Sequence, residues 1–443
     1  MDVMTETILR RTLLTLIVII FCGVVFHAPA SVWLGTILQD YQQIIKSWKE
    51  LLLLLALGVT IVQVSRHHLW RELLSDWVIR LSLAYVTVHL LLLPFMWQGL
   101  MPAMAGLMID LRFVVFFVVV YTACKLYPFW RRPLLWGGFV AAALAMLFVV
   151  LQLVVLPRDF LVHLGYGENT IAPYMTVDQN DDYVRINGTL RGPNPLGAYG
   201  VIVASLCLAV LVATRKKLVK SRFFGDIWDI GAVGLVALAA VWFSYSRAAL
   251  VALALAIGII LIIRYGKRVS RTVWVAIGLS ALLLVGGVYV ARDTHFVSHV
   301  ILHEDPDEGN NVNSNDQHWD SLIEGVDRVA RQPLGAGIGS TGSPSLIESE
   351  GFIIENYYLY VAHEAGWAGL ALFVALFAVV MRRLWRYRHD WLALGVLASG
   401  AGLMIASLVL PVWADDTVSV VWWGLAAIAL ATGQPKNKGV KHE

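Results

Sequence analysis

A glycine-rich polar loop that runs into an apolar segment decides the fold of this chain. The loop reads PLGAGIGSTGSPS (333–345), and after an acidic gap the chain continues as ENYYLYVAHEAGWAGL (355–370) into a long apolar run. The first turns of the predicted helix carry Glu355, Asn356, His363 and Glu364. Ionisable groups at membrane depth cost about 2.5–3.5 kcal/mol each, so they mark a functional site by default.

The composition predicts a polytopic membrane protein. Of the 443 residues, 58% are hydrophobic and 15% are charged, whereas a soluble domain is about half apolar and a quarter charged. Apolar runs of this length cross a bilayer as helices. We therefore expect an all-α fold in which residues 1–443 form a single membrane domain. The twelve predicted spans are 11–28, 48–64, 75–95, 106–124, 134–156, 194–214, 229–244, 247–264, 272–291, 355–381, 391–411 and 417–433.

The basic residues fall on alternate connections between these spans. They begin with Arg10 and Arg11 and include RKKLVKSR (215–222) and RRLWRYR (382–388). By the positive-inside rule these connections face the cytoplasm, together with both termini. The opposite, extracytoplasmic face carries two long loops, 157–193 and 292–354, where we expect the chemistry. Within the second loop, HWDSLIEGVDRVARQP (318–333) predicts a short amphipathic helix along the membrane surface or over the site.

The three cysteines give no sign of a metal or disulfide framework. Cys22, Cys124 and Cys207 lie far apart in separate apolar runs, without a spacing typical of zinc ligands. We expect neither a metal site nor a cofactor.

Two arginines on different outer connections predict an anion site. Arg191 lies in GTLRGPNPLGAYG (188–200), just before a helix whose N-terminus favours anions. Arg247 lies in WFSYSRAALVALAL (242–255), at a very short turn between two spans. A guanidinium group binds phosphate through two parallel hydrogen bonds, so two of them suit a pyrophosphate, with Asn194 and Ser246 beside them. The alternative for either arginine is an anchor to lipid headgroups.

The helix after the glycine-rich loop supplies two candidates for a general base. Either Glu355 or His363 is chemically able to take a proton from a sugar hydroxyl. Alternatively, Glu355 is a helix-start acid and His363 makes a structural hydrogen bond between helices. The supporting residues are an adjacent polar stripe, two small packing residues and a histidine of the amphipathic helix, namely Asn356, Tyr360, Gly366, Gly369 and His318.

Two other pairs of charged residues have no assigned role. Asp110 and Arg112 stand near the outer end of a predicted span, and a pair between them is one possibility. Asp415 and Asp416 close the last outer turn.

These pieces together resemble the O-antigen ligase and polymerase superfamily of bacterial membrane glycosyltransferases. The resemblance covers roughly residues 185–380 and rests on RGPNPLGAYG, SYSRAALVALAL, the stretch from 318 to the glycine-rich loop, and ENYYLYVAHEAGWAGL. It implies transfer of a glycan from undecaprenyl pyrophosphate, at the outer leaflet of the inner membrane, with inversion and without a metal. It also implies that Arg191 and Arg247 hold the pyrophosphate.

One departure from the family pattern bears on the acceptor. In the ligases a histidine is followed by Asn, Ser or Gln, then by nine residues and GxxG. Here Asn356, Gly366 and Gly369 fit that spacing, but Glu355 stands at the histidine position. This favours a polymerase, whose acceptor is a second lipid-linked repeat unit, over a ligase, whose acceptor is lipid A–core.

A protein-glycosylating relative and a lipid-linked glycan flippase remain as alternatives. A flippase is disfavoured because the polar groups gather at one face and the two halves of the chain look unrelated. The expected partners are the donor and acceptor lipids and the surrounding membrane, with no nucleic acid. The expected location is the bacterial inner membrane, with many spans and an active site that faces the periplasm or cell exterior.

Overall fold

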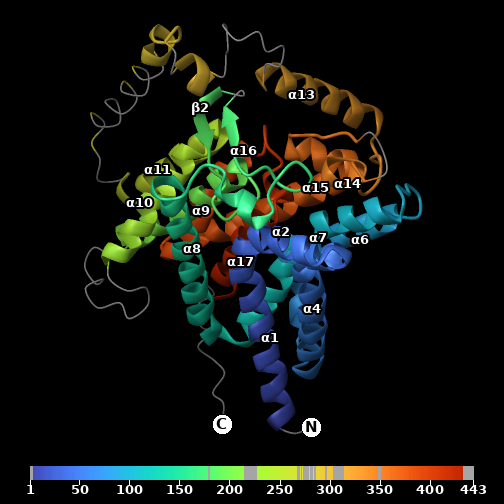
Figure 1. The fold of residues 1–443 in the computed structure, drawn as a ribbon. Coiled ribbons are helices and arrows are strands. Elements are labelled where there is room, and N and C mark those ends of the chain that lie inside the picture. Colours follow the sequence, from blue (N-terminus) through green and yellow to red (C-terminus); the bar gives the residue numbers. More distant parts are fainter. Residues whose placement is uncertain are drawn as a thin grey trace.

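The computed structural model of the protein describes residues 3–177, 180–213, 227–266, 286–294, 297–302, 314–347 and 351–432, with four isolated positions between 267 and 285. The chain is an all-α polytopic membrane protein in these residues, apart from one small hairpin (Figure 1). The main helices are α1 (Val3–Gly23), α2 (His27–Ile37), α4 (Trp48–Arg66), α6 (Trp77–Leu92), α7 (Leu100–Leu126), α8 (Arg131–Val154), α9 (Pro193–Ala213), α10 (Ile227–Phe243), α11 (Arg247–Tyr265), α13 (Ser314–Arg331), α15 (Tyr357–Arg386), α16 (Trp391–Ala406) and α17 (Asp416–Thr432).

The apolar helices follow the hydropathy of the sequence. Seven helical stretches of the described residues are long and apolar enough to cross a membrane, and four shorter apolar helices accompany them. Eleven of the twelve predicted ranges coincide with these helices. The range 272–291 lies mostly outside the described residues. The number of crossings and their direction stay predictions.

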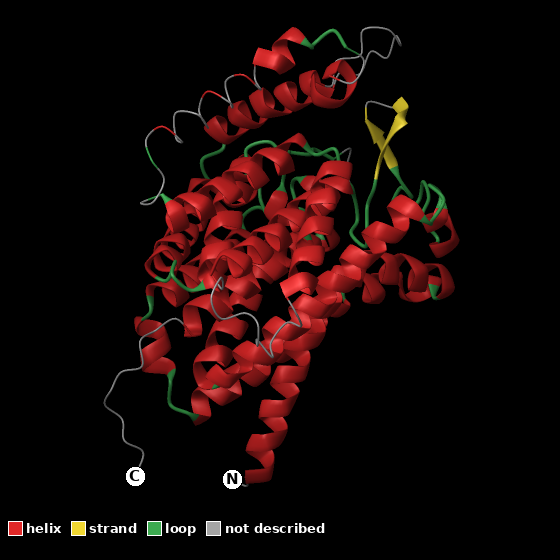
Figure 2. Ribbon diagram, turned by 90° about the vertical axis from the view of Figure 1, so that its left-hand side faces the viewer, coloured by secondary structure: helices red, strands yellow, loops and turns green. Residues whose placement is uncertain are grey.

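A β-hairpin interrupts the otherwise helical chain within the loop 157–193. Strands β1 (Met175–Val177) and β2 (Asn180–Arg185) pair antiparallel, with Met175 opposite Arg185. The sequence analysis did not predict these strands. Figure 2 shows the hairpin at the same end of the molecule as α13, away from the start of α1.

Ion pairs join the basic connections at the end of the molecule where α1 begins. Arg66, at the end of α4, lies 3.3 Å from a carboxylate oxygen of Glu6. Arg383 of α15 lies 2.5 Å from Asp76, the residue that caps α6. Burial by itself raises the pKa of Asp76, but hydrogen bonds from Arg383 and Tyr121 bring that pKa below its ordinary value. Connections that the sequence assigns to one side of the membrane are therefore in contact.

Aromatic rings fill the core where α7, α15, α16 and α17 meet. Phe377 stacks on Trp422 with ring centres 5.2 Å apart, and Phe113 lies 5.1 Å from Trp423. All four side chains are buried.

The glycine loop, residues 333–341, is packed into a break in α15. Gly366 has φ +67°, so α15 kinks there, and the freed amide of Trp367 donates to the carbonyl of Pro333 at 3.0 Å. A Cβ at Gly366 would lie 2.6 Å from that same oxygen. On its other side the loop presses Gly337 against the carbonyl of Met96. The glycines are thus required by close packing, which sequence reasoning had left open.

Helix α13 lies over the first half of α15. The indole nitrogen of Trp367 donates to the carbonyl of Val329 at 3.0 Å, and Gly325 faces Leu359. The side chain of Trp319 is exposed. Helix α13 covers most of the segment 318–333, for which an amphipathic helix was predicted. The part of α13 that contacts α15 covers the first half of that helix. Its contact with a membrane surface stays a prediction.

Candidate functional site

The connections that carry Arg191 and Arg247 lie against each other. Arg185, at the end of β2, donates from Nη2 to Oδ1 of Asn194 at 2.7 Å and from Nε to the carbonyl of Ser244 at 2.9 Å. One side chain thus bridges the segment after Arg191 and the segment before Arg247. Sequence reasoning missed Arg185 because it belongs to the hairpin that was not predicted.

Arg191 is well placed to meet a ligand. It lies two residues before α9, and its side chain is 47% exposed. Its Nε is 3.5 Å from Oδ2 of Asp415. Burial and the neighbouring Asp416 raise the pKa of Asp415, although Arg191 opposes that shift. Asp415 therefore orients the guanidinium group while most of its donors stay available to solvent.

Arg247 is the first residue of α11. Ser246 precedes the helix and is buried, and its amide donates to Oγ of Ser244 at 3.2 Å. Between them Tyr245 has φ +48°, which closes the turn between α10 and α11. The guanidinium Nη1 donates to the carbonyl of Leu302 at 3.1 Å. Arg247 therefore extends toward the π-helical turn Val297–Leu302.

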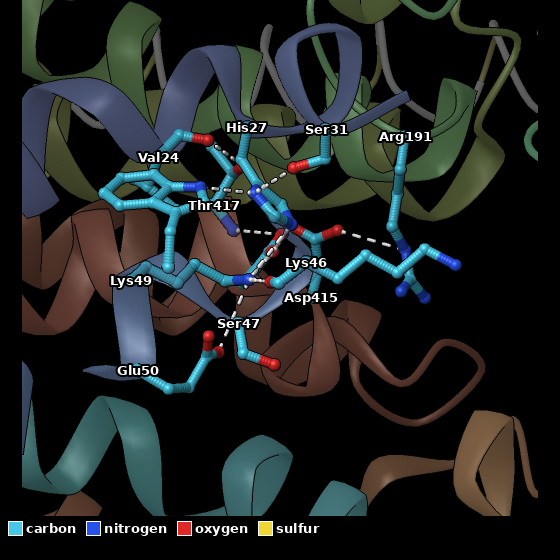
Figure 3. Close-up of polar contacts among 12 residues, drawn as sticks. Val24, His27, Ser31, Lys46, Ser47, Lys49, Glu50, Arg191, Asp415 and Thr417 are labelled. Atoms are coloured by element: carbon cyan, nitrogen blue, oxygen red, sulfur yellow. Dashed lines mark hydrogen bonds and ion pairs between the residues drawn. The ribbon is translucent and has the colours of Figure 1, made fainter. Parts of the chain in front are cut away.

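A buried group of charges, here called the central polar cluster, lies beside Arg191 (Figure 3). It consists of His27, Lys49, Glu50 and Asp416. The ammonium group of Lys49 is 3.1 Å from Oδ2 of Asp416 and 3.4 Å from Oε1 of Glu50. Lys49 is only 5% exposed, so its charge is balanced by these carboxylates rather than by water. Sequence reasoning missed His27 because it is an isolated polar residue in a mostly apolar stretch, and it missed Lys49 because that residue is one of several polar residues before an apolar run.

Polar contacts at both ring nitrogens hold the imidazole of His27. The indole N–H of Trp48 donates to Nδ1 of His27 at 2.9 Å. The other nitrogen, Nε2, lies 3.2 Å from Oδ2 of Asp416 and 3.0 Å from Nζ of Lys49. Lys49 reaches the same oxygen of Asp416. Two side chains from the first part of the chain thus hold the first residue of α17.

One predicted general base, Glu355, lies just before α15, and the other, His363, lies within it. The prediction that Glu355 and Asn356 lie in the first turns of the helix was wrong, because α15 begins at Tyr357. Asn356 caps it instead, with Oδ1 accepting the amides of Tyr358 and Leu359 at 2.9 and 3.1 Å. A cap residue has a non-helical backbone, so Glu355 precedes the helix. Glu355 is half-buried there.

His363 is enclosed, unlike Glu355. It is 2% exposed, and its ring meets the edge of Phe352 with centres 6.1 Å apart. Arg328 of α13 lies 4.0 Å from the centre of the same Phe352 ring. Asn356, Tyr360, His363 and Trp367 recur at helical spacing, but they do not form a single surface, because Tyr360 and His363 are buried while Trp367 is 55% exposed.

The remaining supporting residues have separate positions. Gly366 forms the kink, and Gly369 lies three residues after it in α15. His318 belongs to α13, but its side chain lies outside the described residues.

The connection 407–415, between α16 and α17, gathers the pieces of the site. The amide of Tyr357 donates to the carbonyl of residue 407 at 2.9 Å, and Nδ2 of Asn356 donates to that of residue 408 at 2.8 Å. Arg112 donates to the carbonyl of residue 414. Arg191 pairs with the carboxylate of residue 415. The start of α15 and the start of α9 are therefore tied to one short segment.

Comparison with known proteins matches part of the chain to a family. Residues 232–374 match the family described as O-antigen ligase. This match supports the resemblance to the O-antigen ligase and polymerase superfamily that the sequence motifs predict. No curated protein matches the chain. The matched range contains Arg247, Glu355, His363 and the glycine loop, whereas Arg191 and the central polar cluster lie outside it.

The structure corrects the pairing of one set of charged residues. Asp110 and Arg112 do not pair, because residues two apart on a helix point in nearly opposite directions. Arg112 instead lies 3.5 Å from Oε1 of Glu50, and Asp110 lies 3.6 Å from Nε2 of His89. Among the residues that the structure describes, no group of three or more His, Cys, Asp or Glu side chains is suited to hold a metal ion.

Proposed function

We propose that the chain is a membrane glycosyltransferase that moves a glycan from undecaprenyl pyrophosphate to an acceptor sugar at the outer face of a bacterial inner membrane. The match of residues 232–374 to the O-antigen ligase family supports a lipid-linked glycan as substrate class. Glu355, which stands where the ligases have a histidine, favours polymerisation over ligation to lipid A–core.

The exposure of Arg191 at the start of α9 is the observation that carries this proposal. A half-exposed guanidinium group, oriented by Asp415 and placed before a helix N-terminus, is the arrangement expected for an anion site. Arg247 stands on the adjacent connection. Together the two cations stabilise the negative charge that grows on the departing pyrophosphate.

The transfer itself needs one base and no other reactant. The oxygen of the acceptor hydroxyl attacks the anomeric carbon from the face opposite the pyrophosphate, and the new glycosidic bond forms as the bond to the phosphate oxygen breaks. Undecaprenyl pyrophosphate leaves with the bonding electron pair. The hydroxyl proton passes to the base.

Glu355 is the first candidate for that base and His363 the second. Glu355 is half-buried ahead of α15, whereas His363 is enclosed under Phe352. Asn356 supports Glu355 by fixing the start of the helix and its link to residue 408.

The central polar cluster helps to hold Arg191 in the proposed pyrophosphate site. Lys49 and His27 hold Asp416, and the next residue toward the N-terminus, Asp415, holds Arg191. The contacts of the cluster with Asp416 therefore restrict the position of Asp415, and Asp415 in turn restricts the position of Arg191.

The end of the molecule that carries α13 and the hairpin is proposed to face the periplasm or cell exterior. The basic connections and their ion pairs gather at the other end, as the positive-inside rule requires of the cytoplasmic side. Undecaprenyl-pyrophosphate-linked glycans would then be used on the outer leaflet.

A transfer assay in nanodiscs tests the proposal. Purified protein receives undecaprenyl-pyrophosphate-linked repeat units, and the product is resolved on a gel. Arg191→Ala and Arg247→Ala should each lower the rate by about 100-fold, the usual cost of removing one donor to a developing anion. Arg158→Ala is the matched control, because Arg158 lies in the same loop as Arg191 but donates to the carbonyl of Asp181. Full transfer by the double Arg191→Ala, Arg247→Ala variant would exclude the proposed role.

The acceptor is decided in the same assay. A ladder of products without added acceptor identifies a polymerase. A single shifted product that requires lipid A–core identifies a ligase, and the polymerase assignment would then be withdrawn.

A further inference from the structure

The glycine loop, residues 333–341, has no part in the transfer as proposed above, although two helices enclose it. On one side the amide of Gly337 donates to the backbone carbonyl of Glu364 in α15 at 3.2 Å. On the other side Gly339, with φ +87°, lies against the backbone of Pro102 in α7. The loop is therefore a packed part of the membrane domain, and its last residue has a fixed position.

That last residue, Thr341, contacts the segment that leads into α15. Its hydroxyl Oγ1 donates to the carbonyl of Phe352 at 2.6 Å and accepts the amide of Ile354 at 3.2 Å. A hydroxyl has one proton to donate and lone pairs that accept, so one side chain serves both groups. Thr341 and Ile354 are both buried, so water does not compete for these hydrogen bonds.

Of the two backbone groups, the amide of Ile354 depends more on Thr341. The carbonyl of Phe352 also accepts the amide of Gly342 at 3.0 Å, and Oγ of Ser345 accepts the amide of Phe352 at 3.2 Å. These bonds hold Phe352 without the hydroxyl of Thr341. A buried amide that loses its acceptor is costly, so removal of that hydroxyl should displace Ile354 first.

Ile354 stands directly before Glu355, the first candidate for the general base. On the other side of Glu355, Asn356 caps α15 and donates from Nδ2 to the carbonyl of residue 408 at 2.8 Å. The backbone of Glu355 therefore lies between two residues with fixed contacts. Thr341 holds one of them, and the connection between α16 and α17 holds the other.

Thr341 is in turn attached to α15 beyond its start. Its amide donates to Oε1 of Glu364 at 3.3 Å. The ring of Phe352 lies between Arg328 of α13, 4.0 Å from its centre, and His363 of α15, whose ring centre is 6.1 Å away. Contacts on two helices thus fix both the threonine and the segment that it holds.

We propose that Thr341 is a positioning residue for the glycosyl transfer, which fixes the backbone before Glu355 so that the carboxylate reaches the acceptor hydroxyl. In this role Thr341 contacts neither substrate and takes up no proton. The inference rests on the proposed function, because it takes Glu355 as the base. It also gives the glycine loop a part in the reaction, since the packing of its glycines brings Thr341 to Ile354. A misplacement of about 1 Å is enough to slow such a step about 100-fold.

Hydrogen exchange of the full-length protein in nanodiscs tests the contact without substrate. Thr341→Val keeps the shape of the side chain but has no hydroxyl, so the amide of Ile354 should exchange about tenfold faster. Thr341→Ser keeps the hydroxyl and should exchange as wild type. Thr170→Val is the matched control, because the hydroxyl of Thr170 lies in the other long loop and donates to the carbonyl of Gly165 at 2.9 Å. Equal exchange of Ile354 in wild type and Thr341→Val would overturn the proposal.

The transfer assay then tests the effect on the reaction. Thr341→Val should lower kcat by about 10- to 100-fold and leave the KM for the donor unchanged, because Arg191 and Arg247 keep their positions. Thr341→Ser should recover most of kcat, and Thr170→Val should behave as wild type. An unchanged kcat in Thr341→Val, or a rise in the donor KM that accounts for the whole loss, would contradict the positioning role.

The two measurements separate failure of this inference from failure of the proposed function. Wild type that transfers no glycan would overturn the proposed function and the positioning role with it, while faster exchange in Thr341→Val would still support the contact with Ile354. Active wild type with equal kcat in Thr341→Val would overturn the positioning role alone. If Thr341→Val does not fold, Thr341→Cys replaces it, because a thiol is a weak hydrogen-bond partner, and the same outcomes decide.

Discussion

Replacement of Gly366 by alanine should destabilise the protein more than any ordinary helix substitution. Gly366 lies inside α15 with φ +67°, and a Cβ there would lie 2.6 Å from the carbonyl carbon of Leu334 and from the carbonyl oxygen of Pro333. Both atoms belong to the backbone of the glycine loop, so neither moves without moving the loop. The hydrogen bond from the amide of Trp367 to Pro333 is then lost as well.

The size of the effect follows from these three costs. A residue with a Cβ in the left-handed region costs about 1–2 kcal/mol. Forcing an extra methyl group into a packed region costs about 1–3 kcal/mol, and a lost backbone hydrogen bond costs about 1 kcal/mol. The three share atoms and do not add fully, so we expect the free energy of unfolding to fall by about 3–5 kcal/mol.

Thermal unfolding in detergent, followed by size-exclusion chromatography, measures this change. Each kcal/mol shifts Tm by about 2–4 °C in a 150–250-residue domain and by less in a longer chain, so Gly366→Ala should lower Tm by about 5–10 °C. Gly58→Ala in α4 is the control, because no atom lies within 4 Å of a Cβ built there. It should leave Tm unchanged or raise it, since alanine favours a helix by about 0.5–1 kcal/mol. Equal Tm values for Gly366→Ala and wild type would refute the packing of the loop into the kink.

Two further substitutions, Lys49→Met and Asp76→Asn, test two ion pairs by the same measurement of thermal unfolding. Lys49→Met should lower the free energy of unfolding by about 3–5 kcal/mol because it leaves Asp416 buried without its cation, and adding Asp416→Asn should recover part of the loss. A change below about 1 kcal/mol would mean that the pair behaves as an exposed one. Asp76 has a pKa below its ordinary value, so its contribution is present above about pH 4 and is lost as the pH falls further. Asp76→Asn should therefore lose stability at neutral pH and show a flatter decline of Tm in acid than wild type, and an identical decline would contradict the role given to Arg383.

Hydropathy was sufficient to predict most of the helices, but it did not predict where they break. The apolar run 355–381 is a helix over most of its length, yet Asn356 moves its start to Tyr357 and Gly366 breaks it. Neither feature changes the hydropathy of the run. A break of this kind is favourable only because the glycine loop supplies the missing hydrogen-bond partner, which lies more than thirty residues away in sequence.

The arginines of the candidate site were predictable because charge is conspicuous in an apolar sequence. Arg191 and Arg247 stood out on the face with few basic residues, and the structure brings their connections into contact through Arg185. Lys49 was not predictable in the same way. Its partner Asp416 lies at the other end of the chain, and no local pattern links the two.

Asp110 shows a different limit. It stands in an apolar run two residues from Arg112, and sequence proximity suggested that arginine as its partner. Helix geometry excludes Arg112, but only the packing of α7 on α6 places Oδ2 of Asp110 3.6 Å from Nε2 of His89. A pairing between helices requires knowledge of which faces meet.

The contact of Lys49 and His27 with Asp416 has a consequence for biogenesis. A polytopic chain enters the bilayer from its N-terminus during synthesis. Lys49 and His27 are therefore synthesised long before their partner Asp416. Until the span that begins at Asp416 is made, the two basic side chains must remain at a water-accessible level or near the insertion machinery. A chain cut short before residue 416 would lose one of the two carboxylate partners of Lys49 and keep only Glu50 near that buried lysine. The buried ion pair therefore joins residues made early and late in synthesis, and it forms only after α17 has been made.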